Sequence, residues 1–235
     1  MDTQTRHALK GDKFAQAAQS GVDWVSGHRT NVMRWVIAGV SILLIIAAGL
    51  IFWDTSASAA NAQLGAALDT YSSPLATPGV PPQKGVYNTT ADRAKAANEK
   101  FTAVAQKYSW LPEGAKAHYF AGVTYADLGQ NGQAETELKA AAGSWNHDLS
   151  NLAKLALAGV YRKTNRDSDA ISMYNELASK PSATVTTAVA QLDLADLYAA
   201  SGKQAEARAL WAKVKDADKD GAAGAIAAQK LSGGQ

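Results

Sequence analysis

Hydrophobic and polar positions divide the chain into one long apolar run and a later series of short periodic segments. The run covers 19 uncharged residues from Trp35 to Trp53. As a helix it would be roughly 28 Å long, close to the ~30 Å hydrocarbon core of a bilayer. Eleven of its residues are Val, Ile, Leu or Phe, which favour insertion, and a tryptophan at each end suits the headgroup interface. We therefore expect one transmembrane helix over residues 35–53.

Basic residues are concentrated on one side of this run. Five precede it: Arg6, Lys10, Lys13, Arg29 and Arg34. Residues 54–83 contain no Lys or Arg, so the positive-inside rule places residues 1–34 in the cytoplasm as a tail and residues 54–235 on the far side. A signal peptide cleaved near Ala57-Ser58-Ala59 is the alternative, but it would need a shorter apolar core and a shorter lead.

The cytoplasmic tail has a weak helical pattern of its own. Phe14, Ala18, Val22 and Val25 recur at helical spacing, so residues 9–26 could form an amphipathic helix that lies on the membrane or touches a partner. Three glycines in and beside this segment oppose a helix. A partly ordered tail is the alternative.

Residues 54–90 read as a stalk followed by a Pro-rich loop. Residues 54–71 are rich in alanine and are expected to continue the membrane helix. Pro74, Pro78, Pro81 and Pro82 then exclude regular structure over residues 72–89. A loop of this length is either functional or mobile, and we expect it to be mobile.

From residue 91 onwards the chain repeats itself with a helical period. Aligning Tyr125, Tyr161 and Tyr198 gives successive units 36 and 37 residues apart. Four residues after each tyrosine stands a residue type that tolerates the left-handed conformation ending a helix, namely Gly129, Asn165 and Gly202. Nine residues after each tyrosine stands an alanine, and thirteen after it a large apolar residue: Ala134, Ala170 and Ala207, then Leu138, Tyr174 and Trp211. This pattern predicts two helices joined by a tight turn, with the alanine at their closest approach.

These positions resemble the tetratricopeptide repeat, which has a period near 34 residues and small, Tyr, Ala, large apolar and small residues in that order. Three units match: Gly122, Tyr125, Ala134, Leu138 and Ala141; Ala158, Tyr161, Ala170, Tyr174 and Leu177; Ala195, Tyr198, Ala207, Trp211 and Val214. The units are divergent, because His118, Lys154 and Gln191 stand where the repeat has an early Trp. Upstream, residues 97–112 look like the second helix of a further unit whose first helix is the stalk.

The resemblance implies an all-α fold. The N-terminal transmembrane helix would be followed by a tetratricopeptide-like α-solenoid of helix-turn-helix repeats over residues 91–235, closed by a C-terminal capping helix.

The order of these parts is similar to one family, the ancillary subunit of the bacterial Sec translocon. Its members have a short cytoplasmic tail, one span and a periplasmic tetratricopeptide-like domain, and the similarity includes the Ala-Arg-Ala-Leu-Trp run at 207–211. The resemblance implies an inner-membrane protein that hands exported polypeptides to periplasmic chaperones, with translocon subunits, chaperones or exported chains as partners. A scaffold or assembly factor for another envelope complex is the alternative.

In tetratricopeptide arrays the first helices line a concave groove, so the resemblance also implies a partner-binding site. Its positions here are Lys116, Tyr119, Val123, Asp127, Leu152, Leu155, Arg162, Lys163, Val189, Leu192 and Asp196. Tyr119, Leu155 and Leu192 are equivalent and would form an apolar stripe with charges at its rim, suited to an apolar helix or an extended peptide. The alternative is that the stripe packs against a neighbouring helix, such as residues 221–231.

Composition narrows the class of partner. The chain has no cysteine, which excludes disulfides and thiol nucleophiles. Beyond residue 34 it carries eighteen basic and eighteen acidic residues, and this balance argues against nucleic acid, which needs a basic face. About 180 residues beyond the membrane suffice for one domain with a sizeable core.

Catalytic and metal-binding patterns are weak. The histidines are His7, His28, His118 and His147, and none has the spacing of a zinc site. Glu135 and Glu137 stand two apart on a helix and would point to different faces. The chain has no nucleophile elbow, phosphate loop or dinucleotide fingerprint, so we expect no enzyme and no cofactor.

One string resembles part of a calcium loop. Asp216, Asp218, Asp220 and Gly221 occupy positions one, three, five and six of an EF-hand, but Ala227 stands where the bidentate glutamate belongs. The other interpretation is a polar turn whose aspartates cap the helix that follows.

Overall fold

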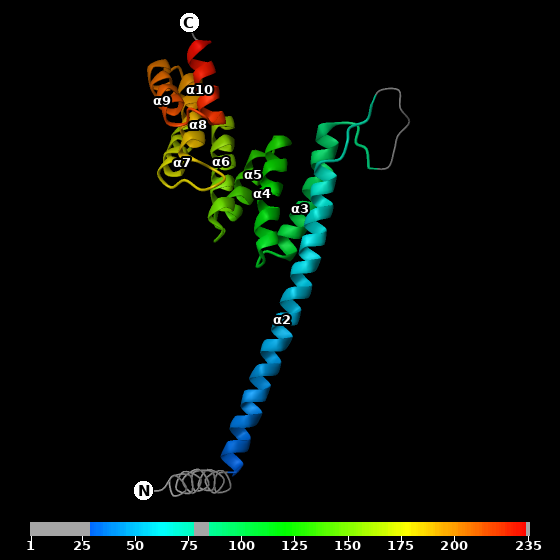
Figure 1. The fold of residues 1–235 in the computed structure, drawn as a ribbon. Coiled ribbons are helices and arrows are strands. Elements are labelled where there is room, and N and C mark those ends of the chain that lie inside the picture. Colours follow the sequence, from blue (N-terminus) through cyan, green and yellow to red (C-terminus); the bar gives the residue numbers. More distant parts are fainter. Residues whose placement is uncertain (1–28, 78–84, 234–235) are drawn as a thin grey trace, which may run out of the picture. The chain divides into compact units, whose positions relative to one another are not determined.

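The computed structural model describes residues 29–77 and 85–233, and Figure 1 shows their arrangement. The described residues form nine helices: α2 (Arg29–Tyr71), α3 (Thr90–Lys107), α4 (Pro112–Asp127), α5 (Asn131–Ala142), α6 (His147–Lys163), α7 (Asp167–Ser179), α8 (Thr187–Ala200), α9 (Gln204–Ala217) and α10 (Ala222–Ser232). These residues contain no β-strand, so the expected all-α fold is confirmed. The helix predicted over residues 9–26, with His7 and His28, lies outside the described residues.

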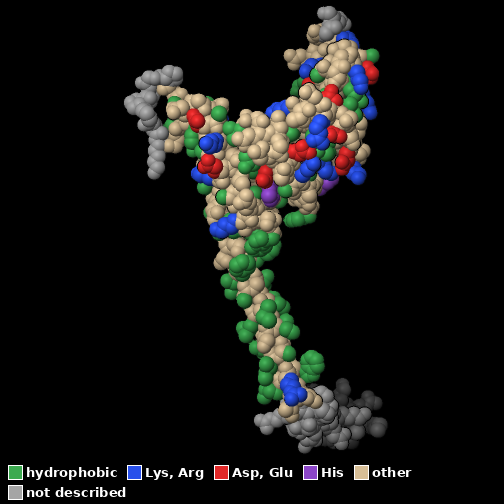
Figure 2. Space-filling view, turned by 180° about the vertical axis from the view of Figure 1, so that it is seen from behind, with side chains coloured by type: hydrophobic (Ala, Val, Ile, Leu, Met, Phe, Trp, Pro, Cys, Tyr) green, Lys and Arg blue, Asp and Glu red, His purple; other side chains and the backbone are tan. Residues whose placement is uncertain are grey.

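The chain divides into two compact units between Thr55 and Ser56. In the first unit, α2 carries large apolar side chains that are exposed on all sides, among them Leu43, Ile45 and Leu50. Figure 2 shows these hydrophobic side chains covering the helix. Among the described residues α2 is the one helix long and apolar enough to cross a membrane, and is a candidate span.

The second unit begins at Ser56, well before the boundary at residue 91 that the repeat pattern predicts. Ala60, Leu64 and Ala67 are spaced to share one face of α2, and all three are buried in a cluster with Phe101 and Ala117. The second part of α2 is therefore the first helix of an additional repeat and α3 is its second helix, as the sequence predicted for the stalk and residues 97–112.

The three sequence-defined turns adopt the same conformation. Gly129, Asn165 and Gly202 have φ values of +73°, +57° and +78°, so the left-handed residues predicted at these positions are confirmed. In each turn the N–H of the next residue donates to the carbonyl oxygen of the aligned tyrosine: Gln130 to Tyr125, Arg166 to Tyr161 and Lys203 to Tyr198, each at 2.8 Å. This repeated bond returns the chain to pack antiparallel on the preceding helix.

Small residues let the paired helices approach closely. Ala134, Ala170 and Ala207 are completely buried, as predicted from their place in the repeat. A Cβ added to Gly122 would lie 2.5 Å from Cγ of Leu138, so α4 and α5 can pack at this distance only with glycine there.

The Pro-rich loop is closed at its described ends. The Ala76 N–H donates to the Tyr87 carbonyl at 2.8 Å, and the Tyr87 N–H donates to the Pro74 carbonyl at 3.2 Å. Arg93 of α3 also donates through Nη1 to the Ser73 carbonyl at 2.9 Å. The predicted mobility covers residues 72–89, and residues 78–84 of this loop lie outside the described part of the chain.

Candidate partner-binding groove

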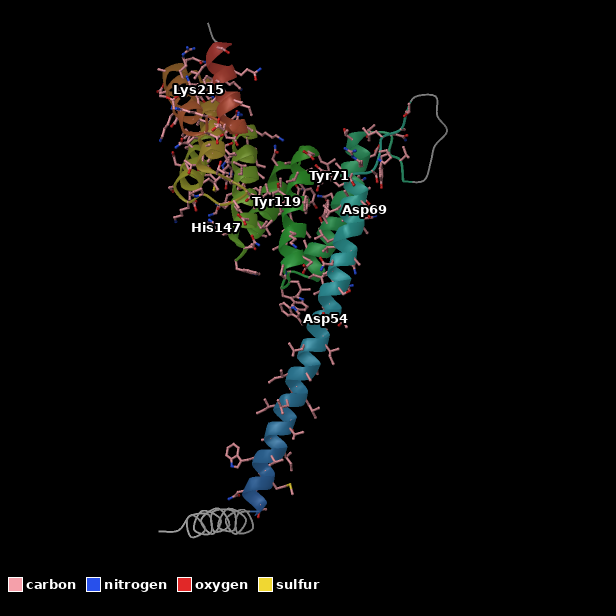
Figure 3. The ribbon with its side chains drawn as sticks, in the orientation of Figure 1. Asp54, Asp69, Tyr71, Tyr119, His147 and Lys215 are labelled. Carbon is pink, nitrogen blue, oxygen red and sulfur yellow. The ribbon has the colours of Figure 1, made fainter. Side chains whose placement is uncertain are left out.

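The apolar residues predicted to line the groove lie on α4, α6 and α8. Tyr119, Val123, Leu152, Leu155 and Val189 are half-buried and pack against the hydrophobic cluster of the central repeats. Burial raises the pKa of the Tyr119 hydroxyl, which keeps this phenol neutral at physiological pH. We call these five partly exposed residues the apolar floor. Figure 3 labels Tyr119 on α4.

Leu192 differs from its equivalents. It is only 9% exposed and belongs to a separate cluster with Trp211 of α9 and with Ala223 and Ala227 of α10. The residue therefore packs beneath the C-terminal helix and is not part of the partly exposed floor.

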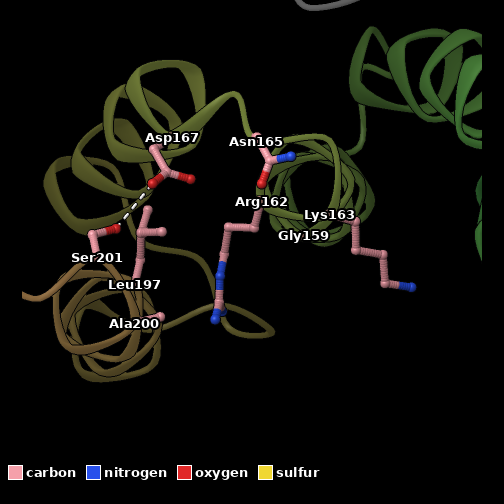
Figure 4. Close-up of a pocket in the computed structure, with 8 residues that line it drawn as sticks. All are labelled: Gly159, Arg162, Lys163, Asn165, Asp167, Leu197, Ala200 and Ser201. Atoms are coloured by element: carbon pink, nitrogen blue, oxygen red, sulfur yellow. Dashed lines mark hydrogen bonds between the residues drawn. The ribbon is translucent and has the colours of Figure 1, made fainter.

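Three of the predicted charged residues gather at the C-terminal ends of α4 and α6. Arg162 and Lys163 line a hollow of about 530 Å³ between α6, α7 and α8, shown in Figure 4. Asp127 and the same Lys163 line a second hollow of about 430 Å³. Lys163 therefore borders both hollows, and in Figure 4 its side chain points away from Asp167 and Ser201; we call the two hollows together the polar groove.

Residues that the sequence did not single out complete the first hollow. Asp167 and Ser201 lie next to each other in its lining, and the Ser201 hydroxyl donates to Oδ2 of Asp167 at 2.9 Å, as Figure 4 shows. Asn165 also lines it. Asn165 is the left-handed turn residue between α6 and α7. Its position in the repeat could therefore have predicted that it lines the first hollow.

The second hollow receives side chains from α2 and α3. The Tyr71 hydroxyl donates to Oδ2 of Asp127 at 3.1 Å. Arg93 lines the same hollow, and its Nε is buried without a hydrogen-bond partner.

The polar residues of α8 form a network beside the first hollow. Oδ1 of Asp196 accepts from Nε1 of Trp211, and Oδ2 accepts from Nζ of Lys230, each at 3.0 Å. Burial raises the pKa of Asp193, the positive charge of Arg162 lowers it in part, and Asp196 raises it further. Asp196 is thus committed to internal bonds that hold α9 and α10 against α8.

Lys116 lies apart from the polar groove. It stands in the second turn of α4, where its Nζ pairs with Oε1 of Glu113 at 3.8 Å, whereas Asp127 ends the same helix. Eleven residues of helix separate the two, about 16 Å. The structure therefore brings together Asp127, Arg162 and Lys163 and leaves Lys116 outside.

The acidic residues considered as catalytic or metal-binding candidates form contacts that stabilise the fold. Glu135 pairs with Lys139 and Arg166, whereas Glu137 pairs with His118 at 2.6 Å, so the two glutamates point to different faces as predicted. Oδ2 of Asp218 accepts from the Gly224 N–H at 3.0 Å and so caps α10. No group of three His, Asp or Glu residues within 29–77 and 85–233 could hold a metal ion.

A family model described as a tetratricopeptide repeat-like domain matches residues 29–233. No curated protein and no solved structure gives a match. The matched range includes the candidate span as well as the repeats.

Proposed function

Because the chain belongs to the tetratricopeptide repeat-like domain family, whose repeats are interaction modules, we propose that it is a membrane-anchored protein–protein interaction module ancillary to the Sec translocon. In this proposal residues 1–34 are cytoplasmic and the repeats are periplasmic. They would link exported polypeptides to periplasmic chaperones. The span-then-repeats layout and the basic residues before the span support this arrangement.

The observation that carries the proposal is the polar groove joined at Lys163. Its lining offers positive groups from Arg93, Arg162 and Lys163 and negative groups from Asp127 and Asp167. An extended polypeptide carries backbone donors and acceptors along its whole length as well as side chains of both signs. A groove of mixed charge therefore suits a range of polypeptide segments, which is what a module that receives exported chains requires.

One observation favours the alternative, a scaffold with a fixed envelope partner. The apolar stripe stops at Leu192, which α10 covers, so no continuous hydrophobic track runs along all three repeats. A surface without such a track offers less sequence-independent apolar contact to many different chains, and this favours one fixed partner.

Site-specific photocrosslinking in intact membranes tests the proposal. A photoreactive residue replaces Lys163, and the matched control replaces Lys215, an exposed lysine of α9 outside both hollows. Adducts with nascent exported chains, chaperones or translocon subunits from position 163 alone support the export role. A single stable envelope protein would instead support the scaffold. Equal adducts from both positions would count against the polar groove.

A charge-reversal variant checks the same site without a probe. Arg162→Glu with Lys163→Glu removes both positive groups of the first hollow and is expected to abolish recovery of the crosslinked partner. Lys213→Glu with Lys215→Glu, two substitutions on exposed positions of α9, is the control and should leave recovery unchanged.

A further inference from the structure

Two tryptophans mark the edge of the repeats opposite the polar groove. Trp110 in the α3–α4 turn is 46% exposed, and Trp145 in the α5–α6 turn is 83% exposed. Both line a hollow of about 330 Å³, together with Leu111, Pro112 and Ala115. Two partly exposed indole groups grouped at one hollow with further apolar residues form a surface patch, and such patches are typical of interaction sites. We call this surface the tryptophan edge.

Contacts within the repeats show at which end this edge lies. Helix α3 runs antiparallel to the second part of α2, because Arg93 bonds to the carbonyl oxygen of Ser73 at one end, and Nε2 of Gln63 donates to the Tyr108 hydroxyl at the other. Ala57 and Ala59 pack against the cluster that includes Tyr108. The α3–α4 turn therefore lies at the end of the unit where the repeats begin, at Ser56.

The covalent chain joins this end of the unit directly to the predicted span. Ser56 follows Trp53 by three residues, which in α2 is about 4.5 Å of helix. Trp53 ends the apolar run and suits the headgroup interface. The end of the unit that carries the tryptophan edge is thus the end joined covalently to the predicted span, whereas the polar groove lies at the other ends of α4 and α6.

The chemistry of the edge matches the bilayer surface. Indole rings favour the membrane–water interface because they combine a large apolar face with one N–H donor. Lys107, whose Nζ lies 5.1 Å from the centre of the Tyr108 ring, is exposed at the same turn. Its ammonium could reach lipid phosphates while its stem lies along the apolar surface.

We propose that the tryptophan edge docks onto the lipid headgroup region, with Trp110 and Trp145 inserted at the interface. The occupant is the bilayer that holds α2, so the inference rests on the membrane anchoring in the proposed function. Docking would present the polar groove away from the lipid, toward proteins in the aqueous space.

The absence of cysteine allows a direct test with single labels. Ser144→Cys places a nitroxide in the hollow of the tryptophan edge, and Ser201→Cys places one at the polar groove. The full chain is reconstituted into vesicles of phosphatidylethanolamine and phosphatidylglycerol. Collision of each nitroxide with a water-soluble nickel complex is then compared with its collision with oxygen, which partitions into lipid.

The expected result is that the label at 144 is shielded from the nickel complex at least about threefold more than the label at 201, as interfacial burial requires. Adding Trp145→Ala should remove most of this protection, and Trp145→Phe should restore part of it. Because Trp145 is exposed, neither substitution touches the core.

Flotation of the vesicles after a carbonate wash separates the two possible failures. A chain that does not float with the lipid lacks the anchor, and then both the proposed function and the docking are overturned. A chain that floats but shows equal nickel access at both labels retains the anchor and overturns the docking alone. Protection that appears only in native membranes, with equal access in pure lipid, would assign the edge to a protein partner and would also overturn the docking.

Discussion

Leu155 of α6 and Leu192 of α8 hold the same place in successive repeats, yet they have different environments. Leu155 is half-buried on the apolar floor, whereas Leu192 is 9% exposed beneath α10. The repeat determines which face of the helix each side chain occupies. The neighbouring helix then determines whether that face is available to a partner.

The cause of this difference is the close approach of α10. Its buried face consists of Ala223, Gly224 and Ala227, and a Cβ at Gly224 would overlap the carbonyl oxygen of Asp218. Small residues let α10 pack on α8 and α9 and cover Leu192. Within the described residues, Leu155 is not covered by a helix of this kind, and it packs only against the central cluster.

The largest expected effect comes from truncating the two leucines. Leu192→Ala should lower the free energy of unfolding by about 3 kcal/mol, because it leaves a cavity beneath α10, whereas Leu155→Ala should lower it by about 1 kcal/mol. Urea unfolding of the full chain in detergent, followed by circular dichroism, measures both. Equal losses for the two variants would show that α10 does not cover Leu192 in solution.

A smaller loss of stability is expected from adding a methyl group at Gly224, where α10 lies closest to the turn before it. Gly224→Ala should lower the free energy of unfolding by about 2 kcal/mol, because the new methyl group forces α10 away from the α9–α10 turn. Ala225→Gly, at the exposed neighbouring position, is the control for backbone effects and should cost about 1 kcal/mol. Protease cleavage within α10 reports its detachment, and the idea fails if Gly224→Ala is cut no faster than the parent chain.

Trp211→Phe tests the hydrogen bond between Trp211 of α9 and Asp196 of α8. The substitution keeps an aromatic ring but removes the donor to Oδ1 of Asp196, and the expected loss is about 1.5 kcal/mol, typical of a hydrogen bond to a charged group. Asp196 then retains Lys230 as a partner. Thermal unfolding gives the measurement, and an unchanged midpoint would mean that water replaces the indole N–H without cost.

The smallest expected effect is a gain in stability that depends on pH. Burial raises the pKa of Asp193 in the folded state above its value in the unfolded chain. At neutral pH the ionised carboxylate is therefore more stable in the unfolded chain, and its charge disfavours folding. Asp193→Asn should therefore raise the midpoint at pH 7 by about 2 °C. The gain should shrink as the pH falls through the raised pKa, where the native carboxyl becomes protonated.

Asp216→Asn is the matched control, since Asp216 is an exposed aspartate of α9. It should leave the midpoint nearly unchanged across the same pH range. A stability gain for Asp193→Asn that stayed constant at low pH would point to a cause other than the carboxylate charge.

The repeat framework could be predicted from sequence because each signal is local. The left-handed positions at Gly129, Asn165 and Gly202 follow from residue type, and the buried alanines follow from helical spacing. Ala60, Leu64 and Ala67 also carried a helical signal, but the Pro-rich loop separates them from α3 in sequence. The sequence predicted that the stalk and residues 97–112 form this additional repeat, but the start of the unit at Ser56 is set by the packing of α2 on α3.

The candidate site was less predictable because it depends on contacts between repeats. Asp127, Arg162 and Lys163 followed from repeat position. Tyr71 and Arg93 come from the additional repeat, whose register the loop conceals, so no motif placed them beside Asp127. The covering of Leu192 by α10 matches the alternative that the sequence left open, a stripe packed against residues 221–231, and the periodicity of α8 alone could not decide between the two.

Because Lys163 borders both hollows, the binding of charged groups in one hollow affects binding in the other. One ammonium at the boundary can closely neutralise one anionic group at a time, because a second anion would meet a charge already compensated. Two acidic segments arriving in the separate hollows would therefore compete for it, although neither touches the other. A basic segment in one hollow would leave Lys163 free to attract an acidic segment into its neighbour, so the order of charges along a bound chain would decide its direction.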